Sequence, residues 1–303
     1  MEETLRDLAA ERDRLQKISV AYFAVMVIAI LLIFIGPALI GMLLGAALLV
    51  FYFGWLRGRI GSYSDNVGKA NILNGLAEPL QDPVYLGNTG MTAEELDASA
   101  MLPIRTDDNG LLIRHGFEGK KDGGVRRGWE VTFHYQRGAK RTDYAFLSGS
   151  ILTGSFDHEI SGMPEWVAVQ RDLVDENILL KFFREKGYRP VRTENAEPDG
   201  KYLMGVRGDG VLPEKICARL ADLGGRMERL GAVRCTAAEA AVFLDHRFYT
   251  YPIKVRDLPT EEQLRANPLP ERDKIWDFFR FLQNRNEEEE SLPPETEGNG
   301  ATE

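Results

Sequence analysis

Two long apolar runs near the N-terminus dominate the hydrophobic pattern of the chain. Residues 18–35 and residues 38–56 carry no charged side chain. At about 1.5 Å per residue, either run would form a helix roughly 27 Å long, close to the hydrocarbon thickness of a bilayer. Gly36-Pro37 separates them, and proline disfavours helix at the residue before it. The pattern predicts two transmembrane helices joined by a tight turn; the alternative is one kinked, tilted helix with an interfacial end.

The second apolar run has the features of a packed helix with an interfacial end. Gly41 and Gly45 form a G-x-x-x-G step, which lets two backbones approach closely. We expect this face to pack on the first helix, although the same motif also occurs in homodimers, so a homo-oligomer stays open. The residues expected at the membrane interface are Tyr52, Phe53, Trp55, Arg57 and Arg59.

Basic residues flank the predicted hairpin at its two open ends, and the connecting turn has none. They are Arg6, Arg12, Arg14 and Lys17 before the first run, and Arg57, Arg59 and Lys69 after the second. The positive-inside rule then places both termini in the cytosol. We therefore expect a multi-pass protein of a bacterial inner membrane. A cleavable signal peptide fits poorly, because a second apolar run follows at once.

Beyond the hairpin, strand and helix periods are mixed. Residues 1–17 read as an amphipathic cytosolic helix that leads into the first apolar run, and residues 57–285 as the main cytosolic domain. The predicted strands are 111–117, 129–135, 144–156, 166–170, 188–193, 201–206, 233–235 and 241–247, and the predicted helices are 64–80, 92–100, 175–186, 212–230 and 271–284. Because the strands are mostly neighbours in the sequence and the helices are few, we expect an α+β domain with a largely antiparallel sheet.

Charge changes the picture at the C-terminus. The 303 residues carry a formal net charge of −9, and residues 286–303 hold seven glutamates and no base. This composition predicts a disordered acidic tail, which is either a solvating extension or a docking segment for a basic partner. An acidic total also argues against nucleic-acid binding.

One constellation is compatible with metal-dependent hydrolysis. Asp107 or Asp108, then a strand, then Glu118 and Lys120 supply the residue types with which carboxylates hold Mg²⁺ and a lysine polarises the attacking water. The Gly-Gly pair that follows indicates a hairpin tip instead. The four histidines are scattered and the two cysteines form no C-x-x-C pair, so we expect no metal and no other cofactor.

Two further groups have both an ordinary and a functional interpretation. Gly149 to Gly154 has the glycine spacing of a phosphate-binding loop but lacks its lysine, so we expect a bulge or turn. Seven basic residues fall on predicted loops, where they either face anionic lipid headgroups or form a solvated sheet edge. They are Lys120, Lys121, Arg126, Arg127, Arg137, Lys140 and Arg141.

The order of elements resembles that of a known family. The likeness rests on the hairpin at 18–56, the stretch Tyr144-Ala-Phe-Leu-Ser-Gly-Ser-Ile-Leu-Thr-Gly-Ser-Phe156, and the helix–strand–strand order from Leu212 to Phe248. Over most of its length the chain resembles the uncharacterised bacterial family named domain of unknown function 3137. The resemblance implies two N-terminal membrane helices and a cytosolic α+β domain. It implies no catalytic residue, because the family has no established activity.

We therefore expect a membrane-anchored, non-enzymatic protein whose cytosolic domain is a binding or scaffold module with lipid and protein partners. Tethering of this kind raises effective concentration without new contacts. The alternative is a membrane-tethered metal-dependent hydrolase or nuclease. Acidic residues and histidines gathered in one pocket would favour the hydrolase, and an exposed apolar patch or a free strand edge would favour the binding module. Transport is disfavoured because neither apolar run carries an acidic or basic residue.

Overall fold

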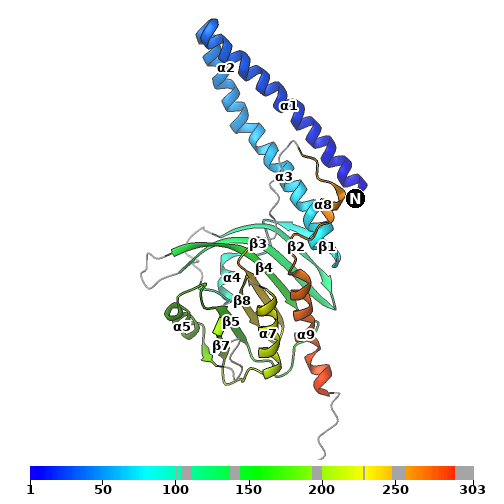
Figure 1. The fold of residues 1–303 in the computed structure, drawn as a ribbon, viewed down its shortest axis with the longest axis vertical. Coiled ribbons are helices and arrows are strands. Elements are labelled where there is room, and N and C mark those ends of the chain that lie inside the picture. Colours follow the sequence, from blue (N-terminus) through cyan, green and yellow to red (C-terminus); the bar gives the residue numbers. More distant parts are fainter. Residues whose placement is uncertain are drawn as a thin grey trace, which may run out of the picture.

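The structure, a computed structural model, describes residues 1–99, 101–103, 111–136, 144–192, 200–227, 229–247 and 257–290. A long helical hairpin stands on a domain built around a single sheet, and helices lie on both faces of that sheet (Figure 1). The α+β class predicted from the sequence is confirmed: two apolar helices precede a sheet-rich domain with a nine-stranded antiparallel sheet.

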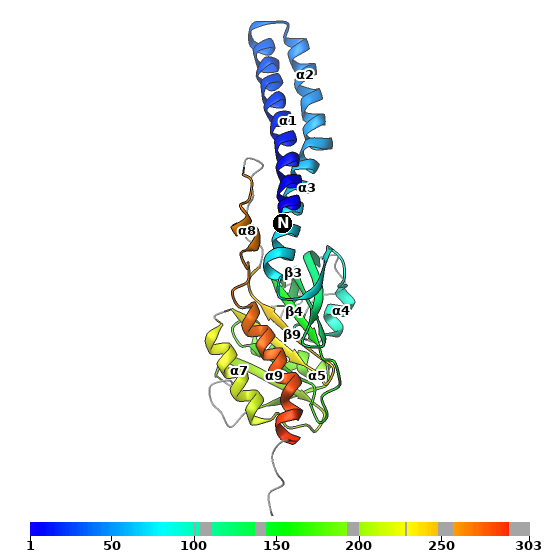
Figure 2. The same cartoon turned by 90° about the vertical axis from the view of Figure 1, so that its right-hand side faces the viewer.

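The hairpin turns at the predicted glycine–proline pair. Helix α1 (Glu2–Ile35) is continuous from the polar N-terminal segment through the first apolar run. Gly36 leaves the helix in an extended conformation, and α2 (Ala38–Phe51) begins directly after Pro37. The helical stretches Glu2–Ile35 and Ala38–Leu76 are both long and apolar enough to cross a membrane. The two helices run side by side from the turn (Figure 2).

The second helix does not end with its apolar run. It continues through the π-helical turn η1 (Tyr52–Leu56), helix α3 (Arg57–Asn71) and a second π-helical turn, η2 (Ile72–Leu76). We call α3 and η2 the stalk; at about 1.5 Å per residue its twenty residues, 57–76, span roughly 30 Å. The helix predicted to reach Leu80 stops at Leu76, and the next residues form a strand that the sequence pattern missed.

All neighbouring strands in the sheet are antiparallel, and their order is β1-β2-β3-β4-β9-β8-β5-β7-β6. The strands are β1 (Gln81–Gly87), β2 (Leu112–Lys121), β3 (Gly124–Gln136), β4 (Tyr144–Ser155), β5 (Trp166–Gln170), β6 (Tyr188–Val191), β7 (Tyr202–Arg207), β8 (Leu230–Cys235) and β9 (Glu239–Leu244). Strands β1 to β4 are neighbours both in the chain and in the sheet. Strand β4 pairs with β9, which joins them to the strands from the second half of the chain.

The helices with fully described bounds that accompany the sheet are α4 (Ala93–Ala98), α5 (Glu176–Glu185), α7 (Glu214–Arg226), α8 (Glu261–Arg265) and α9 (Arg272–Glu290). Side chains cap two of these helices: Thr92 and Glu95 form a capping box at α4, and the Asp175 carboxylate accepts from the first turn of α5. Helix α7 is shorter than predicted, because the chain has already entered β8 at Leu230. Helix α9 includes residues 286–290, which the sequence assigned to the disordered tail; glutamate is a good helix former and extends it.

Side chains that alternate along the strands build one core on each face of the sheet. Trp166 belongs to the core under η2, α7 and α9, whereas the next residue, Val167, belongs to the core under α4 and α5. The first core contains Phe117, Leu152, Leu220, Trp276 and Phe279, and the second contains Trp129, Val131, Phe133, Phe183 and Phe243. Trp129, Val131 and Phe133, within the predicted strand 129–135, share the face that builds the second core.

The glycines at 149 and 154 do not mark a bulge, so that prediction is wrong. Strands β3 and β4 pair without interruption from Arg126 opposite Gly154 to Gln136 opposite Tyr144. A Cβ added at Gly149 would lie 2.1 Å from the carbonyl oxygen of Leu244, and one at Gly154 would lie 2.6 Å from the Phe279 ring. These glycines are needed because neighbouring groups approach the strand closely.

The polar half of α1 folds back along the stalk and closes a small third core. Its buried side chains are Leu8, Leu15, Tyr63, Val67, Ala70 and Leu264, from α1, α3 and α8. The Tyr63 hydroxyl donates to the carbonyl oxygen of Asp257 at 3.0 Å, and the Asn66 amide donates to the Glu11 carboxylate at 2.9 Å. The N-terminal helix, the stalk and α8 therefore pack as one unit.

A buried arginine fastens the end of the stalk to the start of α9. Arg272 donates from Nη1 to the carbonyl oxygens of Gly75 at 2.7 Å and Leu76 at 3.0 Å. The last carbonyls of a helix have no partner within the helix, so the guanidinium satisfies two of them and also places a positive charge at the helix C-terminus. On the next turn back, Asn71 donates to the carbonyl oxygen of Ala266 at 3.1 Å.

Candidate functional site

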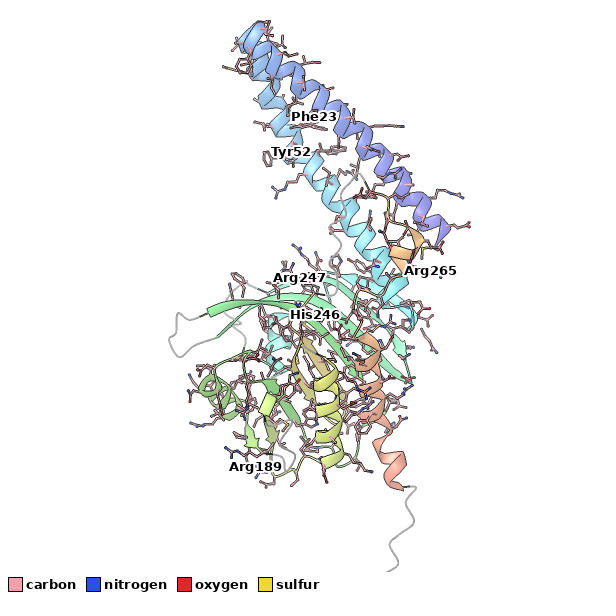
Figure 3. The ribbon with its side chains drawn as sticks, viewed as in Figure 1. Phe23, Tyr52, Arg189, His246, Arg247 and Arg265 are labelled. Carbon is pink, nitrogen blue, oxygen red and sulfur yellow. The ribbon has the colours of Figure 1, made fainter. Side chains whose placement is uncertain are left out.

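One part of the sheet has no helix of the described residues over it. The face that η2 and α9 cover carries Phe117 and Leu152, both fully buried. The same face continues along β2, β3 and β4 with no described helix over it. Its residues lie next to one another because they are paired across neighbouring strands. We call this surface the open face: Leu112, Arg114, Glu130, Thr132, His134, Phe146, Ser148 and Arg247. Figure 3 shows Arg247 on the side of the sheet nearer the stalk.

Exposed apolar and cationic side chains lie together on the open face. Phe146 is 68% exposed and Leu112 is 44% exposed. The Phe146 ring lies 3.8 Å, centroid to centroid, from the ring of His134, its partner across the ladder. Arg114 is exposed, and the Arg247 side chain is 43% exposed. Aromatic and arginine side chains on a surface poor in acidic groups are typical of the centres of protein interfaces.

Glu130 is the carboxylate of the open face, and it is buried. Its Oε1 lies 3.1 Å from Arg247 Nε, and Arg247 Nη2 also donates to Thr132 and Ser148, in both cases at 3.2 Å. The other oxygen, Oε2, is buried and accepts no hydrogen bond from any described residue. Burial raises the pKa of Glu130 above the usual value, and Arg247 and Arg114 only partly oppose this.

The raised pKa predicts how stability depends on pH. In the unfolded chain Glu130 ionises near its ordinary pKa of 4.5, whereas the folded chain holds the proton to higher pH. The unfolded state therefore binds fewer protons in the window that begins near pH 4.5, and this residue lowers the free energy of unfolding as pH rises through it. We expect the free energy of unfolding of Glu130→Gln to rise relative to that of the parent chain as pH increases through the same window, measured by urea titration. A difference that is flat or falls with pH contradicts the assignment.

A strained histidine lies beside the open face, where β1 and β2 meet the stalk. His115 and Gly116 together oppose Trp129, so β2 has a bulge there, and His115 adopts a φ of +52°. Its Nδ1 lies 3.0 Å from the Tyr85 hydroxyl, and Lys69 of α3 lies 6.0 Å over the Tyr85 ring. Burial lowers the pKa of His115 and raises that of Tyr85 to about 12. A neutral imidazole and a neutral phenol thus connect the sheet with the stalk.

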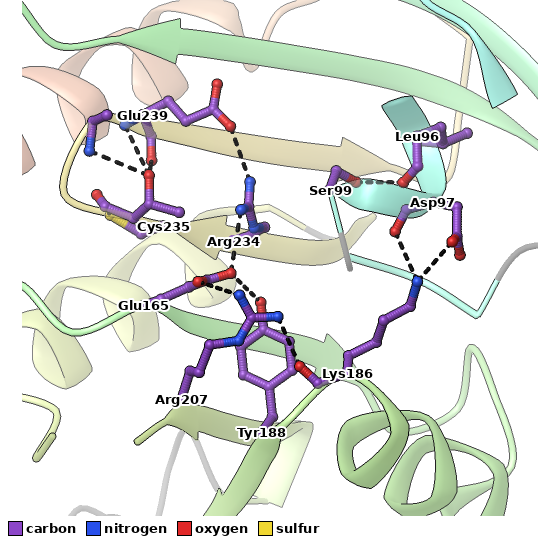
Figure 4. Close-up of polar contacts among 12 residues, drawn as sticks. Leu96, Asp97, Ser99, Glu165, Lys186, Tyr188, Arg207, Arg234, Cys235 and Glu239 are labelled. Carbon is purple, nitrogen blue, oxygen red and sulfur yellow. Dashed lines mark hydrogen bonds and ion pairs between the residues drawn. The ribbon is translucent and has the colours of Figure 1, made fainter. Parts of the chain in front are cut away.

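A second polar cluster, around Glu165, is a set of hydrogen bonds and ion pairs between neighbouring strands (Figure 4). The Glu165 carboxylate accepts from Tyr188 at 2.8 Å, Arg207 at 2.6 Å and Arg234 at 3.2 Å. Burial acts to raise the pKa of Glu165, but the hydrogen bond from Tyr188 and the two guanidinium groups outweigh it and lower the pKa. Both carboxylate oxygens are occupied, so the cluster ties β5, β6, β7 and β8 together and offers no open ligand position.

The structure places only half of the predicted hydrolase constellation. Glu118 and Lys120 lie on β2, and Glu118 forms an ion pair with Arg127 of β3. Asp107 and Asp108 fall outside the described residues. Within the described part of the chain, no group of three or more His, Cys, Asp and Glu residues could hold a metal ion.

The residues predicted at the membrane interface gather around η1. Tyr52 lies 5.2 Å from Phe53 and 5.9 Å from Tyr22 of α1, measured between ring centroids. The Arg59 guanidinium lies 5.7 Å over the Trp55 ring. Arg57 begins α3, directly after the aromatic turn. Figure 3 shows this aromatic group well above the sheet.

The two glycines of the G-x-x-x-G step face different surroundings. A Cβ at Gly41 would lie 2.8 Å from the Ala29 carbonyl oxygen and 2.7 Å from the Ile33 nitrogen of α1. A Cβ at Gly45 would meet no atom within 4 Å. Gly41 therefore lies at the contact between the two helices, and Gly45 faces outward.

Gly41→Leu should separate α1 from α2, whereas Gly45→Leu should leave the hairpin unchanged. We expect Gly41→Leu to destabilise the hairpin by about 1–3 kcal/mol, as overpacking does elsewhere. Thermal unfolding in micelles and the distance between spin labels at Lys17 and Arg57 would measure this. Equal effects of the two variants would show that Gly41 is not the contact point.

The basic residues predicted on loops lie elsewhere. Arg126 is in β3, is fully buried and donates to the carbonyl oxygen of Ser155 at 2.7 Å. The β2–β3 turn lies against α9, because Gln283 donates to the carbonyl oxygen of Asp122 at 3.0 Å. Lys120 and Lys121 end β2, and Arg127 lies in β3, so these residues lie on strands rather than on loops. Arg137, Lys140 and Arg141 fall outside the described residues.

These features define a protein with two membrane-compatible helices ahead of a nine-stranded α+β domain. No family model and no curated protein matches the chain. The chain is similar to the crystal structure of the mycobacterial trehalose monomycolate transport factor A, TtfA, with 8% identity and a TM-score of 0.34 over 75% of this chain and 97% of that one.

Proposed function

We propose that the chain is a membrane-anchored, non-enzymatic binding or scaffold protein of a bacterial inner membrane, with both termini and the sheet domain in the cytosol. The observation that carries this proposal is the open face, which presents exposed Phe146, Leu112 and arginines on a domain fastened to two membrane-compatible helices. In this proposal lipid surrounds the hairpin and a protein is the ligand of the domain. Nucleic acid is not a partner, and membership of the family of domain of unknown function 3137 remains a prediction.

The open face of the sheet, rather than an edge strand, is the surface that supports the proposed binding function. The edge strands of the sheet are β1 and β6, and they contain Pro83 and Pro190. Proline has no N–H to offer an added strand and is typical of edges protected against pairing. Strand β1 is also irregular, with register shifts on both sides of Val84 and Tyr85. Side-chain recognition on the open face is therefore a better basis for binding than strand addition.

Thiol labelling tests the topology. Cys217 and Cys235 are buried, so an added exposed cysteine can be labelled against a low background. On intact spheroplasts, a membrane-impermeant maleimide should label Ile35→Cys at the hairpin turn and should not label Glu185→Cys in the domain until the cells are lysed. Labelling of Glu185→Cys in intact spheroplasts would place the domain outside the cytosol.

Crosslinking in cells tests the binding role against the hydrolase alternative. We expect a stoichiometric protein to co-purify with the full chain after mild crosslinking. It should be retained by a variant with alanine at Asp107, Asp108 and Glu118, because those residues carry only the hydrolase hypothesis. Absence of any partner above background would count against a binding module.

A further inference from the structure

We propose that the open face docks an acidic segment of an integral membrane protein, about one stalk length from where that protein leaves the bilayer. This inference rests on the proposed function and names the kind of partner that its site takes. Three properties of the described residues argue for it: the composition of the face, its charge and its offset from the membrane.

The composition fits a protein ligand. Single exposed apolar residues are common on protein surfaces, but Phe146 and Leu112 lie on one continuous sheet face, on either side of the Thr132–Ser148 pair. Thr132 and Ser148 hydroxyls lie 2.9 Å apart and fix the position of Arg247. The face thus offers a rigid aromatic anchor beside a held guanidinium, the combination that dominates binding energy at protein interfaces.

The charge of the face selects an acidic ligand. Arg114 and Arg247 are exposed or partly exposed, and the carboxylate between them, Glu130, is only 5% exposed. At the border of the face, the Asp65 carboxylate of α3 acts to raise the pKa of Tyr85 and of His115, and Lys69 lies over the Tyr85 ring. Among the described residues, the surface around Phe146 thus exposes two arginines beside one buried carboxylate, and complementary charge would steer and orient an acidic segment.

The stalk excludes the lipid headgroups as the ligand. Its length of roughly 30 Å is several times the Debye length of about 8 Å at physiological salt, and attraction to anionic lipid fades within that length. Helix α9 ends at Glu290, on the side of the domain opposite the hairpin (Figure 1). A protein that emerges from the same membrane can reach the open face directly.

Site-specific photocrosslinking in intact cells tests the inference. A benzophenone amino acid replaces Phe146 in the full-length chain, and the control carries it at Val211, which is 80% exposed and lies before α7. We expect a crosslink from position 146 alone, mapped by mass spectrometry to an Asp- and Glu-rich stretch of a membrane protein, on the cytosolic side of its membrane span. Arg114→Glu should lower its yield about tenfold, whereas Arg189→Glu, an exposed arginine on β6, should not.

Every other outcome overturns the inference. A crosslink to residues 291–303 of the same chain would make the open face an intramolecular site. A crosslink to a second copy would make it a dimer contact. A crosslink to lipid would show that the open face lies at the membrane and not a stalk length away from it. Equal yields from positions 146 and 211, or no crosslink from either, would remove the open face as a docking surface. If the whole domain captures a partner under general crosslinking but position 146 does not, the proposed function survives and this inference fails.

Discussion

Gly149→Ala is expected to destabilise the domain by about 3 kcal/mol or more, at the upper end of what overpacking costs. The new methyl group would lie 2.1 Å from the Leu244 carbonyl oxygen and 2.6 Å from the Phe243 ring. A backbone oxygen in the β4–β9 ladder cannot move without breaking the pairing that joins the two halves of the sheet. Urea unfolding in micelles, followed by fluorescence of the buried tryptophans, would measure the loss.

A matched substitution separates this effect from the general consequences of adding a methyl group. Gly225 lies in α7, and a Cβ there would meet no atom within 4 Å. Gly225→Ala should therefore stabilise the chain by up to about 1 kcal/mol, because alanine is the better helix former. If Gly149→Ala proved as harmless as Gly225→Ala, the close approach of β9 to β4 would be wrong.

Arg272→Met should cost about 3 kcal/mol, the value of two hydrogen bonds from a charged donor. The methionine fills a similar space but leaves the carbonyl oxygens of Gly75 and Leu76 without their buried partner. Hydrogen exchange should also accelerate along η2 and the last turn of α3, because the fastening between the stalk and α9 is lost. Mass spectrometry of peptides covering residues 66–76 would detect this.

The same helix provides the control. Arg280 of α9 is exposed and pairs with Asp277 at 2.7 Å, and exposed pairs of this kind contribute about 0.5 kcal/mol. Arg280→Met should leave both the unfolding curve and the exchange of the stalk nearly unchanged. Faster stalk exchange in Arg280→Met would mean that α9 as a whole, rather than the Arg272 contact, holds the stalk.

Local rules in the sequence predicted those parts of the fold that local rules determine. The two helices separate at Gly36-Pro37, α4 lies within the predicted helix 92–100, and β3 contains the predicted strand 129–135. Strand β1 escaped prediction because it contains Pro83 and pairs with two register shifts. The run of helix from Ala38 to Leu76 escaped it because glycine and polar residues, which interrupt the apolar pattern there, are tolerated when α1 and α8 pack alongside.

The open face could not be predicted, because it depends on partners that are distant in sequence. Arg247 meets Thr132 across 115 positions, and only the order β3-β4-β9 brings them together. Glu130 was a detectable signal, since it alternates with Trp129 and Val131 in a strand and so points to the other face, where a buried carboxylate needs a partner. The role of Gly149 was equally hidden, since it depends on which strand lies beside β4.

The third core also fixes an order of events during synthesis. It joins Leu8 and Leu15, made first, to Tyr63 and Val67 of the stalk and to Leu264, made near the end. In the proposed topology the hairpin enters the membrane while the ribosome is still translating the sheet, so the side of this core that α8 covers stays open until α8 emerges. A chain that stops before Leu258 would keep the apolar side of the third core exposed near the bilayer, where it would bind other unfinished chains or chaperones. Completion of the C-terminal segment is thus the step that closes the protein at the membrane.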